Sequence, residues 1–110
     1  MQIGKLAALT GVSIRMLRYY ESAGLLHPSR TDTGYRSFSS EDVDIVRRIL
    51  ILNGAGFTLP VVRSLLNCVH AGTSPCEELK AKVREQLAQI DRQFDALSES
   101  RKLLNQLIIG

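Results

Sequence analysis

The chain has 110 residues and a mass of 12.2 kDa, which suits one small domain, or a small domain followed by an extended helix, and excludes two globular domains. Its formal net charge is +3, and the first 40 residues hold five Lys and Arg against two Asp and Glu. This local excess is compatible with a polyanionic partner but does not establish one. No long apolar run and no basic-then-apolar leader occur, so we expect a cytoplasmic protein with no membrane partner.

The first 24 residues have the pattern of two short helices joined by a tight bend. Apolar residues at helical spacing over 3–10 predict the first helix, and Gly11 is placed to end it. Ser13 is a suitable N-cap for a second helix that runs to about Ser22, after which Gly24 can take a left-handed conformation. Two helices with so short a connection predict a helix-turn-helix.

Residues 25–38 have a different composition, which predicts a small β-hairpin, or wing. Pro28 breaks any helix, and residues 31–34 are typical of a turn. Tyr35 and Phe38 flank Arg36 in a strand-like run.

A second pair of helices is predicted after the wing. The first begins after a cap at Ser39, ends near Gly54, and has an apolar face that we assign to Val43, Val46, Ile49 and Leu50. The second begins after Thr58, with Pro60 in its first turn, and continues to about Val69. Residues 70–75 are then expected to form a loop.

Residues 76–109 contain neither Gly nor Pro and carry a heptad pattern of apolar residues. Its members are Val83, Leu87, Ile90, Phe94, Leu97, Leu104 and Ile108. At about 1.5 Å per residue such a helix is roughly 50 Å long, too long to bury this stripe against four short helices. We therefore expect a helix-mediated homodimer, with a helix folded back in a monomer as the alternative.

One face of the second helix is basic and aromatic, which is typical of a helix that enters a DNA major groove. Arg15, Arg18 and Tyr19 lie at positions i, i+3 and i+4 on one side of this helix. Leu17, Tyr20 and Glu21 fall on another side. The alternative is an ordinary solvated helix face. The wing adds Arg30, Tyr35 and Arg36, which we expect to contact the DNA backbone, although Tyr35 could instead pack on the neighbouring helix.

The order of these motifs resembles the MerR family of bacterial transcription regulators over almost the whole chain. The matching segments are IGKLA at 3–7, GVS at 11–13, LRYYE at 17–21, GLL at 24–26, GYR at 34–36 and GFTL at 56–59, followed by the heptads. The resemblance implies a mainly α fold: a winged helix-turn-helix with a second helical pair in residues 1–69, a loop at 70–75, and a dimerisation helix at 76–110 that forms an antiparallel coiled coil. Because no further segment follows this helix in the sequence, we expect a short form with no C-terminal effector domain.

The resemblance further implies a function. A member of this family binds a two-fold promoter operator as a homodimer and distorts the spacer between two promoter elements so that RNA polymerase can engage both. The DNA-binding residues are then expected to be Lys5, Ser13, Arg15, Arg18, Tyr19, Arg30, Tyr35 and Arg36.

A metal site is a further hypothesis, because Cys76 resembles the cysteine that metal-sensing relatives carry at the start of the dimerisation helix. With Cys68 and His70 it forms a C-x-H-x5-C arrangement whose thiolates and imidazole suit zinc or copper, although three ligands leave the coordination shell incomplete. Two alternatives stay open at this point: purely structural cysteines, or a redox-active thiol pair.

Three functions therefore remain, from different classes of protein. They are a DNA-binding regulator, a metal- or thiol-responsive sensor that acts through DNA binding, and a coiled-coil interaction protein that does not activate transcription. An enzyme is not expected, because the sequence offers no nucleophile–base pair, phosphate loop or paired carboxylates.

Overall fold

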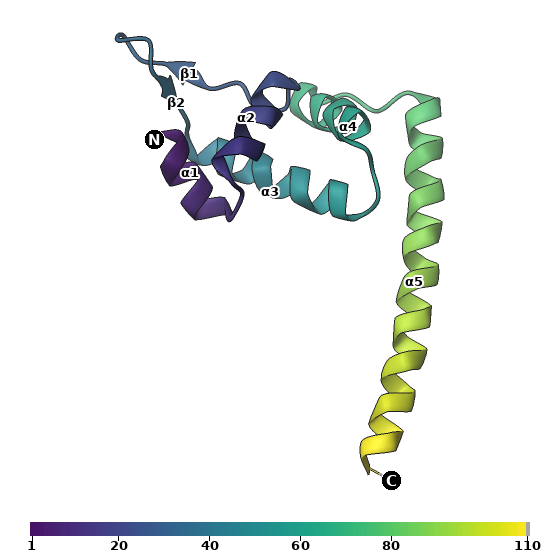
Figure 1. Ribbon diagram of the computed structural model, residues 1–110. Coiled ribbons are helices and arrows are strands. Elements are labelled where there is room, and N and C mark those ends of the chain that lie inside the picture. Colours follow the sequence, from purple (N-terminus) through teal and green to yellow (C-terminus); the bar gives the residue numbers. More distant parts are fainter. Residues whose placement is uncertain (110) are drawn as a thin grey trace.

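A computed structural model describes residues 1–109 and shows five helices and one short hairpin. The elements are α1 (Ile3–Thr10), α2 (Ile14–Ser22), β1 (Ser29–Arg30), β2 (Arg36–Ser37), α3 (Ser40–Gly54), α4 (Leu59–Ala71) and α5 (Glu77–Ile109). Helices α1 to α4 pack together, the hairpin projects from one side of them, and α5 leaves them as a long rod (Figure 1). The molecule therefore extends over 65 Å along its longest axis.

The ends of the first two helices follow the predicted local chemistry. Gly11 ends α1 in a left-handed conformation with φ of 74°, which favours glycine. The Ser13 hydroxyl then accepts a hydrogen bond of 3.2 Å from the backbone N–H of Met16 and caps α2. The predicted helix-turn-helix is confirmed.

The hairpin is short and antiparallel, with Ser29 paired to Ser37 and Arg30 to Arg36. A turn closes it, in which the N–H of Gly34 donates to the carbonyl of Thr31 at 2.9 Å. The base of the hairpin is fixed to the N-terminus, because the N–H of Phe38 donates to the carbonyl of Met1 at 2.7 Å. The predicted wing is thus present and anchored at its base.

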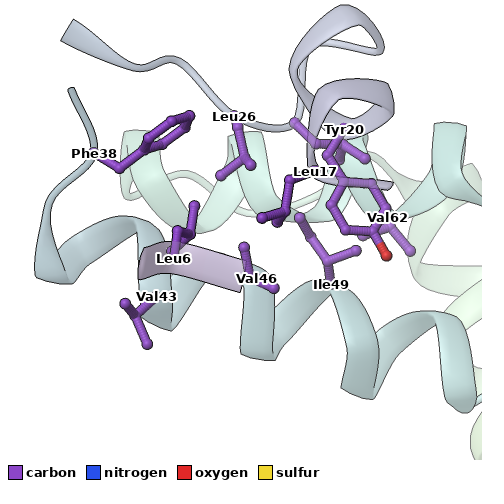
Figure 2. Close-up of a cluster of buried hydrophobic side chains, with 10 residues drawn as sticks. Leu6, Leu17, Tyr20, Leu26, Phe38, Val43, Val46, Ile49 and Val62 are labelled. Carbon is purple, nitrogen blue, oxygen red and sulfur yellow. The ribbon is translucent and has the colours of Figure 1, made fainter. Parts of the chain in front are cut away.

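One hydrophobic core joins all four short helices and both ends of the wing segment (Figure 2). Its fully buried side chains are Leu6 of α1, Leu17 of α2, Leu26 before the wing, Val46 and Ile49 of α3, and Val62 of α4. Because each short helix contributes only a few side chains, none can bury its apolar face alone. The core therefore fixes the orientation of α2 relative to the wing.

Helix α3 differs from its predicted apolar face at one position. Val43, Val46 and Ile49 are buried as expected, but Leu50 is 42% exposed. In a helix each residue is rotated by roughly 100° from the one before it, so Leu50 turns away from the core that covers Ile49. The assignment of Leu50 to the buried face was wrong.

Helix α4 is longer than predicted and includes His70. Gly72, with φ of 68°, ends the helix after Ala71, and the N–H of Thr73 donates to the carbonyl of Cys68 at 3.0 Å. This is the pattern in which a left-handed glycine closes the last turn. The connection to α5 is correspondingly shorter than the loop expected at 70–75.

Candidate DNA-binding surface

Helix α2 separates its side chains into a buried face and an exposed face. Leu17 and Tyr20 belong to the core, whereas Arg15, Arg18 and Tyr19 are exposed. This is the division that the helical spacing predicts. The exposed face therefore carries two arginines and a phenol that no core contact uses.

Tyr20 and Tyr19 are adjacent on α2 but differ in burial, and Tyr20 lies on the buried face. Burial raises the pKa of the Tyr20 hydroxyl above its ordinary value of 10.0, because the ionised phenolate would lose its hydration. Tyr19 next to it is 52% exposed. Two adjacent tyrosines thus have different roles, one in the core and one on the surface.

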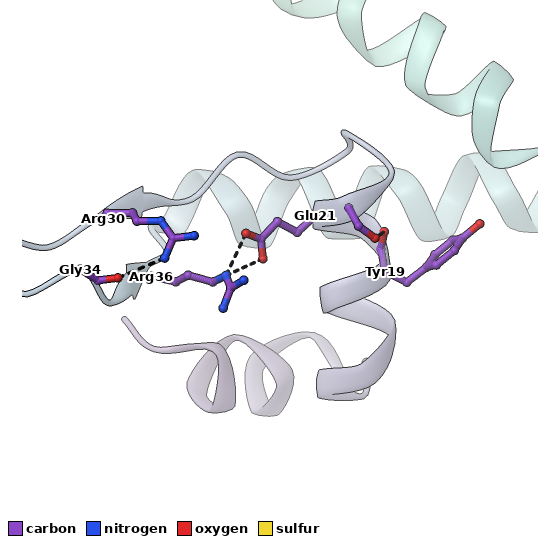
Figure 3. A network of polar contacts seen from close by, with 6 residues as sticks. Tyr19, Glu21, Arg30, Gly34 and Arg36 are labelled. Atoms are coloured by element: carbon purple, nitrogen blue, oxygen red, sulfur yellow. Dashed lines mark hydrogen bonds and ion pairs between the residues drawn. The ribbon is translucent and has the colours of Figure 1, made fainter.

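The wing is attached to α2 by an ion pair (Figure 3). The Nε of Arg36 donates to the carboxylate of Glu21, with distances of 2.8 Å to Oε1 and 2.8 Å to Oε2. At the other strand, Arg30 donates to the carbonyl of Gly34 at 3.1 Å and stiffens the turn. Tyr35 at the tip is 69% exposed, so the alternative in which it packs on a neighbouring helix is wrong.

Three arginines from α2 and the wing meet at one hollow of about 300 Å³ beside α1. They are Arg18, Arg30 and Arg36, and the remaining lining residues are Gln2, Ile3, Gly34 and Tyr35. The structure therefore brings together four of the residues predicted to bind DNA. The other predicted DNA-binding residues are exposed but do not line this hollow: Lys5 on α1, Ser13 just before α2, and Arg15 and Tyr19 on α2.

Sequence reasoning did not identify the role of Glu21. It placed Glu21 on the same side of α2 as the buried residues, and the side chain is indeed 20% exposed. The partner, Arg36, is 15 residues further along the chain, so no local spacing could indicate the pair. A lone carboxylate within a basic surface was the only available signal.

Helix α5 shows almost all of its heptad stripe to solvent. Leu87, Phe94, Leu97, Leu104 and Ile108 are exposed, and Val83 and Ile90 are half-buried. Only Leu79, near the start of the helix, is buried against the rest of the chain. The stripe is therefore available to a partner over most of its length.

The three predicted metal ligands lie in different environments. Cys68 is half-buried on α4, His70 is exposed at the end of α4, and Cys76 is exposed just before α5. His70 and Cys76 line separate hollows. Within residues 1–109, no group of three or more His, Cys, Asp or Glu side chains is placed to hold a metal ion. The predicted three-ligand set is thus not assembled within one chain.

Comparison with known sequences is decisive for the family. The profile described as MerR HTH family regulatory protein, where HTH means helix-turn-helix, matches residues 1–68, and the profile described as MerR, DNA binding matches residues 43–107. The chain belongs to the MerR family. It is 32% identical over 108 residues to heavy metal-dependent transcription regulator 2 of Rhizobium meliloti, covering 97% of this chain and 74% of that protein.

Solved structures of the MerR family have the same fold. A MerR family regulator lacking the sensor domain, bound to promoter DNA, superposes with a TM-score of 0.71 at 25% identity, over 90% of this chain and 76% of that one. A transcription regulator from Ralstonia metallidurans in complex with lead(II) gives a TM-score of 0.70 at 28% identity, over 96% and 83%. The chain is therefore a DNA-binding transcription regulator with a helix-turn-helix and a small wing, as the sequence predicted.

Proposed function

We propose that this MerR-family chain acts as a homodimer that binds a two-fold promoter operator. Each copy places its α2 helix and its wing on one half-site. The observation that carries the proposal is the outward basic face of α2, where Arg15 and Arg18 are exposed beside Tyr19. Arginine side chains at the start of an exposed helix can reach base edges and phosphates in a major groove. The hollow lined by Arg18, Arg30 and Arg36 adds positive charge next to it.

The dimer is proposed to form through α5. Its exposed apolar stripe repeats every seven residues, which is the pattern of a coiled coil. Family resemblance favours an antiparallel arrangement of the two helices. Two DNA-binding units held at a fixed separation can bend or untwist the DNA between their half-sites, which would place two promoter elements correctly for RNA polymerase.

The experiment that tests this function starts with selection of an operator from random DNA duplexes by the full-length protein. Affinity is then measured by fluorescence anisotropy for wild type and for Arg15→Ala with Arg18→Ala. We expect the double variant to bind the operator at least about 30-fold more weakly, because each of the two lost base contacts costs about 1–3 kcal/mol.

A matched control removes two positive charges elsewhere. Arg84 and Lys102 are exposed on α5, and replacing both by alanine changes the net charge by the same amount. This variant should keep its operator affinity within about threefold, because screened charges far from the DNA contribute little. Equal losses in both variants would show that net charge, and not the α2 face, carries binding.

A metal response is a second candidate function. The relative from Rhizobium meliloti is named heavy metal-dependent, and the structural neighbour from Ralstonia metallidurans is in complex with lead(II). In this chain Cys76 is exposed just before α5. The donors within one chain do not fit a complete zinc or copper site, because Cys68 is half-buried on α4 and His70 lines a different hollow from Cys76. A site with three or more such protein ligands would therefore need donors that residues 1–109 of one chain do not bring together.

Native mass spectrometry of the reduced protein with added zinc or copper tests the metal response. A dimer that gains a stoichiometric metal, and loses it in Cys68→Ser with Cys76→Ser, would support a sensor. A dimer that stays metal-free would leave a regulator with another signal. A dimer without operator affinity would favour the third hypothesis, a coiled-coil interaction protein.

A further inference from the structure

A second hollow lies where the end of α2 meets α3 and α4, and the DNA-binding proposal does not use it. Its volume is about 150 Å³. Leu25, Ile45 and Leu66 supply apolar walls. The other lining residues are Gly24, His27, Arg48, Arg63, Asn67 and His70. The hollow thus combines an apolar interior with two positively charged guanidinium groups, those of Arg48 and Arg63.

These positive charges have no carboxylate to balance them within the described chain. No acidic side chain lines the hollow, and within residues 1–109 neither Arg48 nor Arg63 forms an ion pair. The neighbouring Arg47, by contrast, pairs with Asp44 at 3.9 Å. Two permanently charged guanidinium groups beside an apolar wall are the usual chemistry for binding an anion.

The guanidinium of Arg63 is held close to the end of α2. A Cβ atom at Gly24 would lie 3.2 Å from the Nε of Arg63, so this side chain packs directly on the glycine backbone. Gly24 also has φ of 80°, a conformation that favours glycine. The backbone at this point is therefore shaped so that the α4 arginine can approach the turn after α2.

We propose that this hollow is a binding site for a small organic anion, whose carboxylate or phosphate group contacts Arg48 and Arg63 and whose apolar group lies against Leu25, Ile45 and Leu66. The size of the hollow limits the apolar group, since a cavity of about 150 Å³ accommodates a benzene ring. The site is separate from the DNA-binding face, because Arg15, Arg18 and Tyr19 do not line it. The proposal does not depend on the operator or on the dimer.

The test uses full-length protein without DNA and follows backbone amide signals by ¹⁵N NMR during titration. The probes are benzoate, phenyl phosphate and the uncharged benzamide. Benzoate or phenyl phosphate should bind with a Kd on the order of 1 mM, as expected for a ligand of so few atoms. Benzamide should bind at least about tenfold more weakly, because it lacks the charge that the arginines recognise.

Two variants locate the site, and a neighbouring residue supplies the control. Arg48→Ala and Arg63→Ala should each weaken binding of the tighter anion about tenfold. Arg47→Ala, one residue from Arg48 and outside the hollow, should leave binding unchanged. Circular dichroism melting checks that each variant is folded. If one of the two variants does not fold, the other still tests the site.

Three results would overturn the proposal. They are equal binding of benzamide and the anions, no binding of either anion, and binding that is insensitive to both Arg48→Ala and Arg63→Ala. If neither anion binds while both variants lose affinity for duplex DNA, these arginines serve the DNA backbone instead.

Discussion

The four short helices and α5 all carry apolar residues at helical spacing but use them in different ways. Helices α1 to α4 bury their apolar residues in one shared core, whereas the 33-residue α5 buries only Leu79 and exposes side chains such as Phe94 and Leu97. Periodicity shows which face of a helix is apolar but not what covers it. The apolar faces of α1 to α4 pack against other parts of the same chain. For the apolar stripe of α5, we propose that a second copy of the chain packs against it.

The largest expected effect is on assembly, from Leu97→Asp. Leu97 is 69% exposed in the single chain, so the substitution should leave the short helices folded. In a coiled coil it would bury a carboxylate in the apolar seam and cost about 4 kcal/mol, or about a thousandfold in dimer affinity. Sedimentation equilibrium measures the dissociation, and circular dichroism checks the remaining fold.

The control for this substitution is Gln89→Asp, an exposed position on α5 outside the heptad stripe. It should leave the dimer intact, because its carboxylate stays hydrated. A Leu97→Asp protein that still forms dimers at low micromolar concentration would contradict the proposed interface.

The next effect is on the stability of the single chain, from Leu17→Ala. Leu17 is fully buried between α2 and the other short helices, so truncation removes apolar contacts and leaves a cavity. The free energy of unfolding should fall by about 3 kcal/mol, measured by urea denaturation. Leu9→Ala on α1, where the side chain is 50% exposed, is the control and should change it by less than about 1 kcal/mol. Similar losses in both variants would argue against a buried Leu17 and an exposed Leu9.

A smaller effect is expected at the start of α3. Asp42 is buried, and its Oδ2 accepts a hydrogen bond of 2.8 Å from the N–H of Ser39. Asp42→Ala should lower the free energy of unfolding by about 1 kcal/mol, through the lost cap and the unpaired N–H. The control is Glu77→Ala, which also removes a carboxylate from the first turn of a helix, α5. Because Glu77 is exposed, this substitution should lower the free energy of unfolding by less than about 0.5 kcal/mol. A larger loss at Glu77 would mean that the start of α5 is more firmly packed than its exposure indicates.

Much of the fold was predictable because its boundaries depend on local chemistry. Gly11, Ser13 and the turn closed by Gly34 each act on neighbours within four residues, which a sequence displays directly. The end of α4 was missed although Gly72 carried the same signal as Gly11. Leu50 was misplaced because it is apolar and adjacent to the buried face, and only the tertiary packing shows that it stays 42% exposed.

The candidate site was predicted residue by residue, but its internal contacts were not. Spacing on α2 correctly separated the exposed Arg18 from the buried Leu17. It could not show that Arg36 reaches back to Glu21, because that pairing depends on where the core places the wing. The assignment of DNA contacts to individual arginines stays a prediction.

The smallest expected effect concerns the ion pair between the wing and α2. Glu21→Gln keeps a group that can accept the Arg36 hydrogen bond but removes the charge. Since the two side chains are 20% and 43% exposed, solvent screens their attraction, and the loss should be about 0.5 kcal/mol. Hydrogen exchange of the wing amides Thr31 and Tyr35 should therefore accelerate about twofold, while the core amides of α2 stay unchanged.

Asp44→Asn is the matched control, because it removes the charge of another surface ion pair, with Arg47 on α3, at 3.9 Å. Exchange in the wing should not respond to it. If Glu21→Gln leaves hydrogen exchange in the wing at the wild-type rate, the ion pair does not stabilise the wing. The contact between Phe38 and Met1 at the base of the wing then holds it, and the wing is stabilised through the core. If the twofold acceleration is found, the wing is a third kind of region, held to α2 by a solvent-screened polar contact, unlike both the buried core and the exposed α5.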